Sequence, residues 1–415
     1  MSFTKWHRSL VFSLLLVSSM LYCRQQAPFA LQASYSSRVP IDSNANVIIY
    51  DTSHAYKHFL QAFDSLIKHR SRSLRILHLG DSHIQADFFP HKLRQLLQQN
   101  PLLGNAGRGY FFPARLAGAG ADPLNIPGQY YFGSWHGCRS ILSDSCSCGI
   151  AGMSALTFQP TATYTFNLDS MYTSCRRIKI YYDTQNNSSY YPVLWAGMRW
   201  HLPRRIHRQG YAEFLVDAPP PYTLGFQRLQ LTQRFFRLQG IIVENNNSGV
   251  LYHSAGLNGA TVASYLRCPE LIEQIAALAP DLVIVSLGTN DAYRQKFNDR
   301  QFKEDYRELV RRIRKAAPSC NILLTTPGDC YFQRQYANPH IATAVQRLKE
   351  LAQEEDLLLW DWFAVMGGSG SIVAWKNAGL ANPDLVHLLL PGYELQGALL
   401  YDALIQLYKQ YKSSL

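Results

Sequence analysis

At 415 residues, with 47% hydrophobic and 17% charged residues, the chain has the composition of a folded protein and is long enough for two domains with separate cores. Intrinsic disorder is therefore excluded as the default state. The net charge of +11 suits polyanionic partners such as cell-wall polymers or lipid headgroups, and it equally suits a basic protein without such partners, but no nucleic-acid-binding signature is present.

The N-terminus has the features of an export signal. Lys5 and Arg8 precede an apolar run over residues 10–21, which is short for a membrane span. We therefore expect residues 1–23 to be a signal peptide and the mature protein to reach the periplasm or the cell envelope. Cys23 is a candidate lipid anchor, although Tyr22 stands before it where such sites prefer a small residue. No later stretch approaches the length of a transmembrane helix.

After the signal, residues 24–45 are polar and irregular, which is typical of a tether. Apolar side chains then recur with helical spacing over residues 53–69. Next comes an apolar run, residues 74–79, which ends at Gly80 and is typical of a buried parallel strand.

Ser82 follows this strand directly, and residues 84–99, with Pro90 near the first turn, predict a helix. Ser82 therefore lies at a strand-to-helix turn. At such a turn a hydroxyl is exposed at the carboxyl edge of the sheet, and the backbone N–H groups can bind an anion. Taken by itself, an Asp-Ser pair in this place is more commonly a helix cap.

Residues 104–110 form a glycine-rich stretch that predicts a loop, but no Gly-Lys-Ser/Thr follows, so it is not a phosphate-binding loop. From 115 to 246, short runs of aromatic, Thr and Val residues alternate with polar ones and are separated by turn residues. This pattern predicts an inserted β-sandwich. Its aromatic residues, among them Trp195 and Trp200, suit stacking on sugar rings, although such residues more often fill a core.

Beyond residue 248, strands and helices alternate again, which requires a parallel sheet with helices on both sides. We expect one α/β domain, formed by residues 46–114 and 247–415, that the β-rich domain of residues 115–246 interrupts. The expected strands are 249–253, 282–287, 322–326 and 357–360, and the expected helices are 271–278, 302–317, 341–354 and 393–411.

Seven of the eight cysteines lie beyond residue 23. In an oxidising compartment some of the four mid-chain cysteines are expected to pair, but their spacing does not fix the connectivity. Cys146 and Cys148 lack the histidine and cysteine spacing of a zinc site. We therefore expect no metal site there. The four mid-chain cysteines are Cys138, Cys146, Cys148 and Cys175.

Active groups of a parallel sheet gather where the strands end at their carboxyl edge. Besides Ser82, these ends offer Gly259, Asn290, and the pair Asp384 and His387. Together they supply a hydroxyl, an unhindered backbone N–H, an amide, and an imidazole with a nearby carboxylate. These are the parts that acyl transfer needs. A second serine, Ser254, resembles the nucleophile elbow of α/β-hydrolases, but Tyr252 occupies the first glycine position of that motif.

These blocks resemble the four that define the GDSL or SGNH hydrolases. They are Gly80-Asp81-Ser82-His83, Asn258-Gly259-Ala260-Thr261, Gly288-Thr289-Asn290-Asp291 and Asp384-Leu385-Val386-His387. The resemblance covers residues 50–113 and 247–412 and implies a three-layer α/β/α domain with a flavodoxin-like parallel sheet. The β-rich insert, which is similar to a carbohydrate-binding module, looks like that of the peptidoglycan O-acetylesterase branch. Two features depart from the family pattern: His83 replaces the leucine of the family name, and the pair Leu385-Val386 is more apolar than usual.

The resemblance implies a role for each residue. Ser82 is the expected nucleophile, His387 the general base and then acid, and Asp384 the group that orients His387. The backbone N–H groups of Ser82 and Gly259 and the side chain of Asn290 are the expected oxyanion donors. The implied function is removal of O-acetyl groups from an acetylated glycan, peptidoglycan first, without metal or cofactor. The alternatives are another GDSL-type lipase or acylhydrolase, a thioesterase, an O-acetyltransferase, and a glycan-binding protein with a vestigial hydrolase domain.

Overall fold

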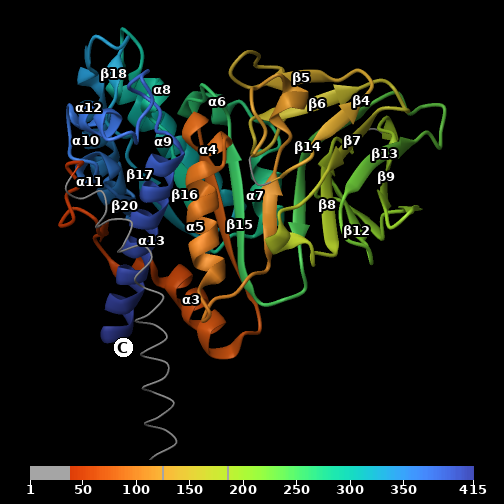
Figure 1. Cartoon of the computed structure of the whole chain (residues 1–415), viewed down its shortest axis with the longest axis horizontal. Coiled ribbons are helices and arrows are strands. Elements are labelled where there is room, and N and C mark those ends of the chain that lie inside the picture. The colour runs from red at the N-terminus through yellow and green to blue at the C-terminus, as the bar shows by residue number, and fades with distance from the viewer. Residues whose placement is uncertain (1–37, 124–125, 185–186) are drawn as a thin grey trace, which may run out of the picture.

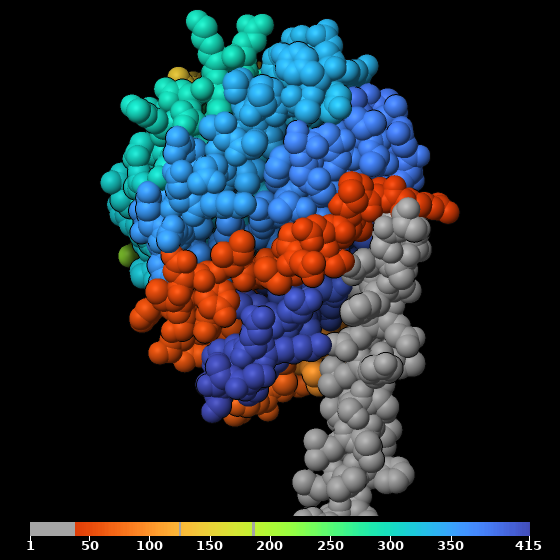
Figure 2. Space-filling view, turned by 90° about the vertical axis from the view of Figure 1, so that its left-hand side faces the viewer, coloured from red at the N-terminus to blue at the C-terminus, as the bar shows by residue number. Residues whose placement is uncertain are grey.

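The computed structural model describes residues 38–123, 126–184 and 187–415. The predicted signal peptide, Cys23 and most of the predicted tether lie outside these residues. The last tether residues pack on the folded chain, because Val39 is buried and the N–H of Asp42 donates to the carbonyl of Val365 at 3.0 Å. From there the chain crosses one face of the molecule beside the C-terminal helix (Figure 2). No helix in the described ranges is long and apolar enough to span a bilayer.

The α/β domain is built on a six-stranded sheet in the order β1-β20-β17-β16-β2-β15. All neighbours pair in parallel except β1, which is antiparallel to β20. The parallel strands, counted along the chain, lie in the order 2-1-3-4-5 of a flavodoxin-like sheet, with the switch point between β2 and β16. The strands are β1 (Ile48–Ile49), β2 (Ser73–Gly80), β15 (Gly249–Gly256), β16 (Leu282–Ser286), β17 (Asn321–Thr325) and β20 (Leu358–Trp360).

Side chains of the parallel strands alternate between two apolar clusters, one on each face of the sheet. Leu74 and Ile76 of β2 pack with α3, α5 and α13, whereas Leu77 and Leu79 belong to the cluster of α6, α7, α9 and α10. Both faces are covered, which gives the predicted three layers (Figure 1). These helices are α3 (Lys57–His69), α5 (Phe88–Gln99), α6 (Val262–Leu266), α7 (Leu271–Leu278), α9 (Asp299–Ala316), α10 (Pro339–Glu354) and α13 (Leu390–Ser413).

The single helix expected over residues 84–99 is wrong, because the chain forms α4 (Ser82–Gln85) and α5 with a break at Asp87. The backbone of Asp87 has φ of 63°, and its buried carboxylate accepts hydrogen bonds from Arg94, Arg108 and Ser254. The Arg108 and Ser254 bonds measure 2.8 and 2.6 Å. Burial alone would raise the pKa of Asp87, but the two guanidinium groups hold it well below its ordinary value.

The predicted insert forms two antiparallel sheets that pack face to face, with Phe226 and Phe236 4.2 Å apart between ring centroids (Figure 1). One sheet contains β4 (Tyr130–Phe132), β7 (Thr163–Phe166), β9 (Tyr191–Ala196), β10 (Arg199–His201) and β13 (Tyr222–Gln227). The other contains β5 (His136–Arg139), β6 (Met153–Thr157), β8 (Arg177–Tyr182), β11 (Arg205–His207), β12 (Tyr211–Leu215) and β14 (Phe236–Glu244). It also includes β3 (Gly107–Phe111), which lies before the predicted start of the insert.

Strand β3 includes much of the stretch predicted as a glycine-rich loop, so that expectation holds only for its first residues. It pairs with β14 and lies against β15, where a Cβ on Gly109 would stand 2.1 Å from the carbonyl oxygen of Tyr252. Gly109 therefore permits a close crossing of backbones, which explains part of the glycine content of this stretch.

Among the mid-chain cysteines, Cys138 and Cys146 form a disulfide, which gives a connectivity that the spacing left open. Cys148 and Cys175 are buried as free thiols, as are the three cysteines of the C-terminal part, Cys268, Cys320 and Cys330.

The buried carboxylate of Asp87 gives a stability prediction. Replacing it in Asp87→Asn leaves two buried guanidinium groups without a counter-charge, so the free energy of unfolding should fall by about 3 kcal/mol or more. Urea denaturation followed by circular dichroism measures this change. The control is Asp217→Asn, which removes the exposed ion pair with Arg199 and should hardly move the midpoint. Equal small shifts in the two variants would contradict the importance of the buried carboxylate.

Candidate active site

Three side chains from distant parts of the chain meet in one cleft. The Oγ of Ser82 lies 2.9 Å from Nε2 of His387, and Nδ1 of His387 lies 2.8 Å from Oδ2 of Asp384. Asn290 lines the same cleft, whose volume is about 360 Å³. The structure thus brings together the serine, imidazole and carboxylate that the sequence analysis singled out, in the order that activates a nucleophile.

The Gly80-Asp81 pair places Ser82 at the end of β2. A Cβ on Gly80 would lie 2.2 Å from Cγ1 of Ile84 and 2.8 Å from the carbonyl oxygen of Ser286, so α4 can fold back against the strand only after a glycine. Asp81 caps α4, because its Oδ1 accepts the N–H of His83 at 3.0 Å. These contacts fix the turn from which the Ser82 hydroxyl projects.

A tight loop before α13 holds the other two groups. Oδ1 of Asp384 accepts the N–H groups of Val386 and His387, both at 2.9 Å, which leaves Oδ2 for the imidazole. Leu385 between them has φ of 58°, a region that favours glycine. The departure from the family pattern at Leu385 therefore places a bulky residue in a strained conformation beside the Asp384–His387 pair.

The charges of Asp384 and His387 favour transfer of the Ser82 proton to the imidazole. The hydrogen bond that Nδ1 of His387 donates to Asp384 raises the pKa of His387 and outweighs the opposing effect of burial. Burial would raise the pKa of Asp384, but its bonds from His387 and the backbone lower it to about 2, so this carboxylate is charged at neutral pH. A charged acceptor on Nδ1 holds the proton there and leaves Nε2 free to take the proton of Ser82.

The expected oxyanion donors lie around the serine. Among the described residues, no acceptor engages the backbone N–H of Ser82 or that of Gly259 in the turn after β15. The side-chain amide of Asn290 donates to the carbonyl of Ala260 at 3.0 Å and to Oδ2 of Asp81 at 3.3 Å. These two bonds connect Asn290 to the residues next to Gly259 and Ser82, so the three predicted donors belong to one neighbourhood.

Sequence reasoning missed the role of His83. Its Nδ1 lies 2.8 Å from the hydroxyl of Tyr393, and its ring lies 5.2 Å from that of His387. Burial, together with the nearby His387, lowers the pKa of His83 to about 3, so His83 is neutral and adds no positive charge beside the base. The signal was present in the sequence, because His83 follows Ser82 and replaces the leucine of the family name.

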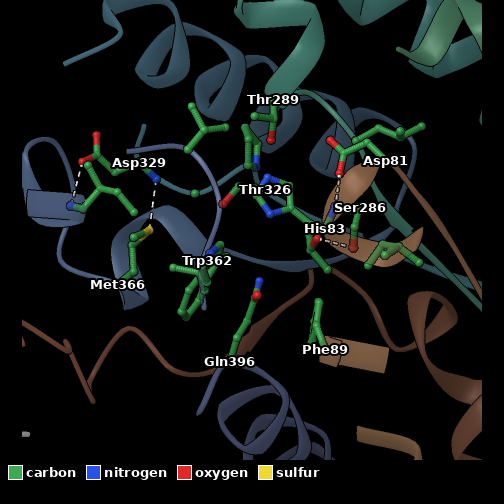
Figure 3. A pocket seen from close by; sticks show the side chains of 18 residues that line it. Asp81, His83, Phe89, Ser286, Thr289, Thr326, Asp329, Trp362, Met366 and Gln396 are labelled. Atoms are coloured by element: carbon green, nitrogen blue, oxygen red, sulfur yellow. Dashed lines mark hydrogen bonds between the residues drawn. The ribbon is translucent and has the colours of Figure 1, made fainter. Parts of the chain in front are cut away.

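A small cavity with a mixed polar and apolar lining lies behind the serine turn (Figure 3). Asp81, His83 and Gln396 contribute to its lining, and its volume of about 30 Å³ suits a single water molecule. Burial raises the pKa of Asp81 to about 7, because the hydrogen bond from His83 and the attraction of His387 only partly oppose it. This carboxyl group accepts a hydrogen bond from the side-chain amide of Asn290 at 3.3 Å.

The other serine motif has no catalytic partner. Ser254 is buried in β15, and its hydroxyl donates a hydrogen bond to Asp87. Within the described ranges, no cluster of three or more His, Cys, Asp or Glu side chains has the arrangement of a metal site.

Comparison with known proteins places these features in a family context. Residues 225–395 match the model of the GDSL-like lipase/acylhydrolase family. A solved peptidoglycan O-acetylesterase is 22% identical and superposes with a TM-score of 0.73 over 88% of this chain and 99% of its own. A lipase/acylhydrolase from Enterococcus faecalis, also 22% identical, covers 39% of this chain and 78% of its own, with a TM-score of 0.32. No curated protein matches the sequence.

The raised pKa of His387 predicts a pH profile. His387 must be neutral to accept the proton of Ser82, so kcat/KM for a small acetyl ester should rise with pH and level off only above the ordinary histidine pKa of about 6.5. Asp384→Asn removes the main cause of the raised pKa, so the midpoint of the rise should move to lower pH while the plateau falls. Asp217→Asn should keep the wild-type midpoint. An unmoved midpoint in Asp384→Asn would contradict the coupling.

Proposed function

We propose that this chain, which has the SGNH hydrolase fold and matches the GDSL-like lipase/acylhydrolase family over residues 225–395, is an exported esterase that removes O-acetyl groups from peptidoglycan or a related envelope glycan. The observation that carries the reaction class is the hydrogen-bonded series from Ser82 through His387 to Asp384. The polymer is supported by the fold, which resembles that of a peptidoglycan O-acetylesterase with the insert included, and by the surface of that insert.

In the proposed mechanism, Oγ of Ser82 attacks the acetyl carbonyl while Nε2 of His387 takes its proton. The carbonyl oxygen becomes an oxyanion, which the N–H groups of Ser82 and Gly259 and the amide of Asn290 stabilise. The C–O bond to the sugar then breaks, and His387 protonates the departing sugar hydroxyl. Water, activated by the same imidazole, hydrolyses the acetyl-Ser82 ester and returns the serine.

Before the reaction, the side-chain amide of Asn290 already donates two hydrogen bonds, to Asp81 and to Ala260. Its longer bond, 3.3 Å to Asp81, is the weaker of the two, so the N–H of that bond is the one that can turn to the oxyanion. The donation then strengthens as negative charge develops, which lowers the barrier rather than the energy of bound substrate.

The insert presents a row of side chains that suits a glycan. Trp200, Trp195, Thr223, Thr165 and Tyr130 are paired in register across five neighbouring strands and therefore lie on one face of that sheet. The two tryptophans are 48% and 39% exposed and Tyr130 is 63% exposed, whereas Leu194 and Leu224, which point to the other face, are fully buried. Thr165 is buried and its hydroxyl lies 2.9 Å from that of Thr223, so the exposed rings are the part of this row that can stack on sugars.

The proposed function is tested by acetate release. The full chain should release acetate from O-acetylated peptidoglycan faster than from acetylated xylan or lipid esters. Ser82→Ala should lower the rate by at least about 10³-fold, His387→Ala by nearly as much and Asp384→Asn by less, since the three act as a unit. Ser413→Ala, at the exposed end of α13, is the control. Preference for xylan or lipid esters would refute the substrate, and an active Ser82→Ala would refute the nucleophile.

The aromatic row is tested by a ratio of rates. In the double variant Trp195→Ala/Trp200→Ala, kcat/KM on intact peptidoglycan relative to that on a small acetyl ester should fall about tenfold, because only the polymer reaches the insert. Leu231→Ala, 82% exposed in the same insert, should keep the wild-type ratio. Equal losses on both substrates would assign the tryptophans a structural role instead.

A further inference from the structure

A short hairpin borders the cleft at Ser82, and the proposed mechanism does not use it. Its strands are β18 (Tyr331–Phe332) and β19 (Tyr336–Ala337). Gln333 and Arg334 at its tip line the cleft together with Ser82, Asn290 and His387. The tip therefore belongs to the surface that an ester substrate meets.

The backbone of this tip is strained. Gln333 and Arg334 have φ of 51° and 62°, and the N–H of Gln335 closes the turn on the carbonyl of Phe332 at 3.0 Å. Two successive positive φ angles are the geometry of a type I′ turn, which favours Asn and Gly. Gln333 and Arg334 are unfavourable residues for such a turn. Their presence indicates that their side chains have a role in the site that outweighs the cost to the turn.

Contacts from two sides hold the tip. The hydroxyl of Tyr293 accepts the N–H of Gln333 at 2.9 Å, and its ring lies 5.1 Å from that of Phe332. The N–H of Tyr331 donates to the carbonyl of Leu385 at 2.9 Å. Because Leu385 lies between Asp384 and His387, the hairpin is fixed relative to the general base.

Arg334 brings an uncompensated positive charge to the cleft. Its side chain is exposed, and no carboxylate of the described residues pairs with it. Asp384 lines the same cleft, but both of its oxygens are engaged by His387 and by backbone N–H groups. The remaining polar groups of the cleft lining, such as Thr289 and Tyr293, carry no negative charge.

We propose that Arg334 binds a carboxylate of the substrate next to the scissile ester, so that the enzyme selects acetylated glycans that carry carboxyl groups. The planar guanidinium presents parallel N–H donors that match the two oxygens of a carboxylate. The neutral aromatic row of the insert fits any sugar chain, whereas Arg334 distinguishes anionic from neutral ones. This inference rests on the proposed esterase function. The carboxylate can belong to the sugar itself or to a peptide attached to it.

Matched pairs of esters test the proposal with the full chain. The first pair is an O-acetylated muramic-acid oligosaccharide with its sugar carboxyl free or converted to the amide. The second carries a peptide whose carboxyls are free or amidated. The third is acetoxybenzoate and acetoxybenzamide, which need no glycan recognition. The readout is the ratio of kcat/KM between the charged and the neutral member of each pair.

Wild type should prefer the charged member about five- to tenfold in at least one glycan pair and in the benzoate pair, and that glycan pair identifies the source. Arg334→Gln should bring the ratio close to one. Arg334→Lys should keep part of it, because lysine retains the charge but not the fork. Arg311→Gln on α9, 79% exposed, should behave as wild type. Raising the salt concentration should shrink the ratio in wild type and leave it unchanged in Arg334→Gln.

Equal rates within all pairs in wild type, or a preference that survives in Arg334→Gln, would overturn the proposal. Failure of the proposed function has a different signature, in which no muramic-acid substrate releases acetate although the aryl esters are hydrolysed. In that case a benzoate preference that Arg334→Gln abolishes still supports carboxylate binding by Arg334. An unchanged melting temperature of Arg334→Gln excludes misfolding as the cause of any loss.

Discussion

The buried carboxylate of Asp87 is the contact on which the geometry around Ser82 depends. It ends α4 only a few residues after the serine and receives Arg94 from α5, Arg108 from β3 and Ser254 from β15. A charge taken out of water requires close partners, so these segments cannot shift separately without leaving a buried ion unpaired. Asp87 thereby connects the serine turn to β15, which leads to Gly259, and to β3, which pairs with the sheet of the insert.

The remaining site geometry follows from the parallel sheet. Ser82, Gly259 and Asn290 follow β2, β15 and β16, three adjacent strands whose carboxyl ends lie at one edge. Ser82 lies beside the switch point of the sheet, where connections diverge and leave a crevice. The loop of Asp384 and His387 approaches this edge from the segment before α13. Two residues with positive φ, Leu385 and Arg334, lie on the loops around the cleft.

The features that follow from the geometry of a parallel sheet could be predicted from the sequence. Strand and helix alternation was sufficient for the parallel sheet, and the parallel sheet for placing Ser82, Gly259 and Asn290 at one edge. Asp384 and His387 lie on a loop well beyond the last strand, and only the family resemblance implied that they meet Ser82. The break at Asp87 was not predictable, because Arg108 and Ser254, which stabilise it, are distant in sequence and carry no local signal. The hairpin with Arg334 was missed for a similar reason, since its two-residue strands lack periodicity and its turn lacks Asn or Gly. Trp195 and Trp200 were candidates, but only the strand register showed which face they share.

The central claim is that Ser82 is a nucleophile activated by His387, and covalent labelling tests it most directly. The full chain is treated with a fluorophosphonate, which reacts with activated serine hydroxyls, and the adduct is located by intact-mass and tandem mass spectrometry. The account predicts one adduct on Ser82 in wild type and greatly slowed labelling in His387→Ala, because a serine without its base is a weak nucleophile. An adduct on Ser254 or another serine, or labelling of Ser82 at an equal rate in His387→Ala, would contradict it.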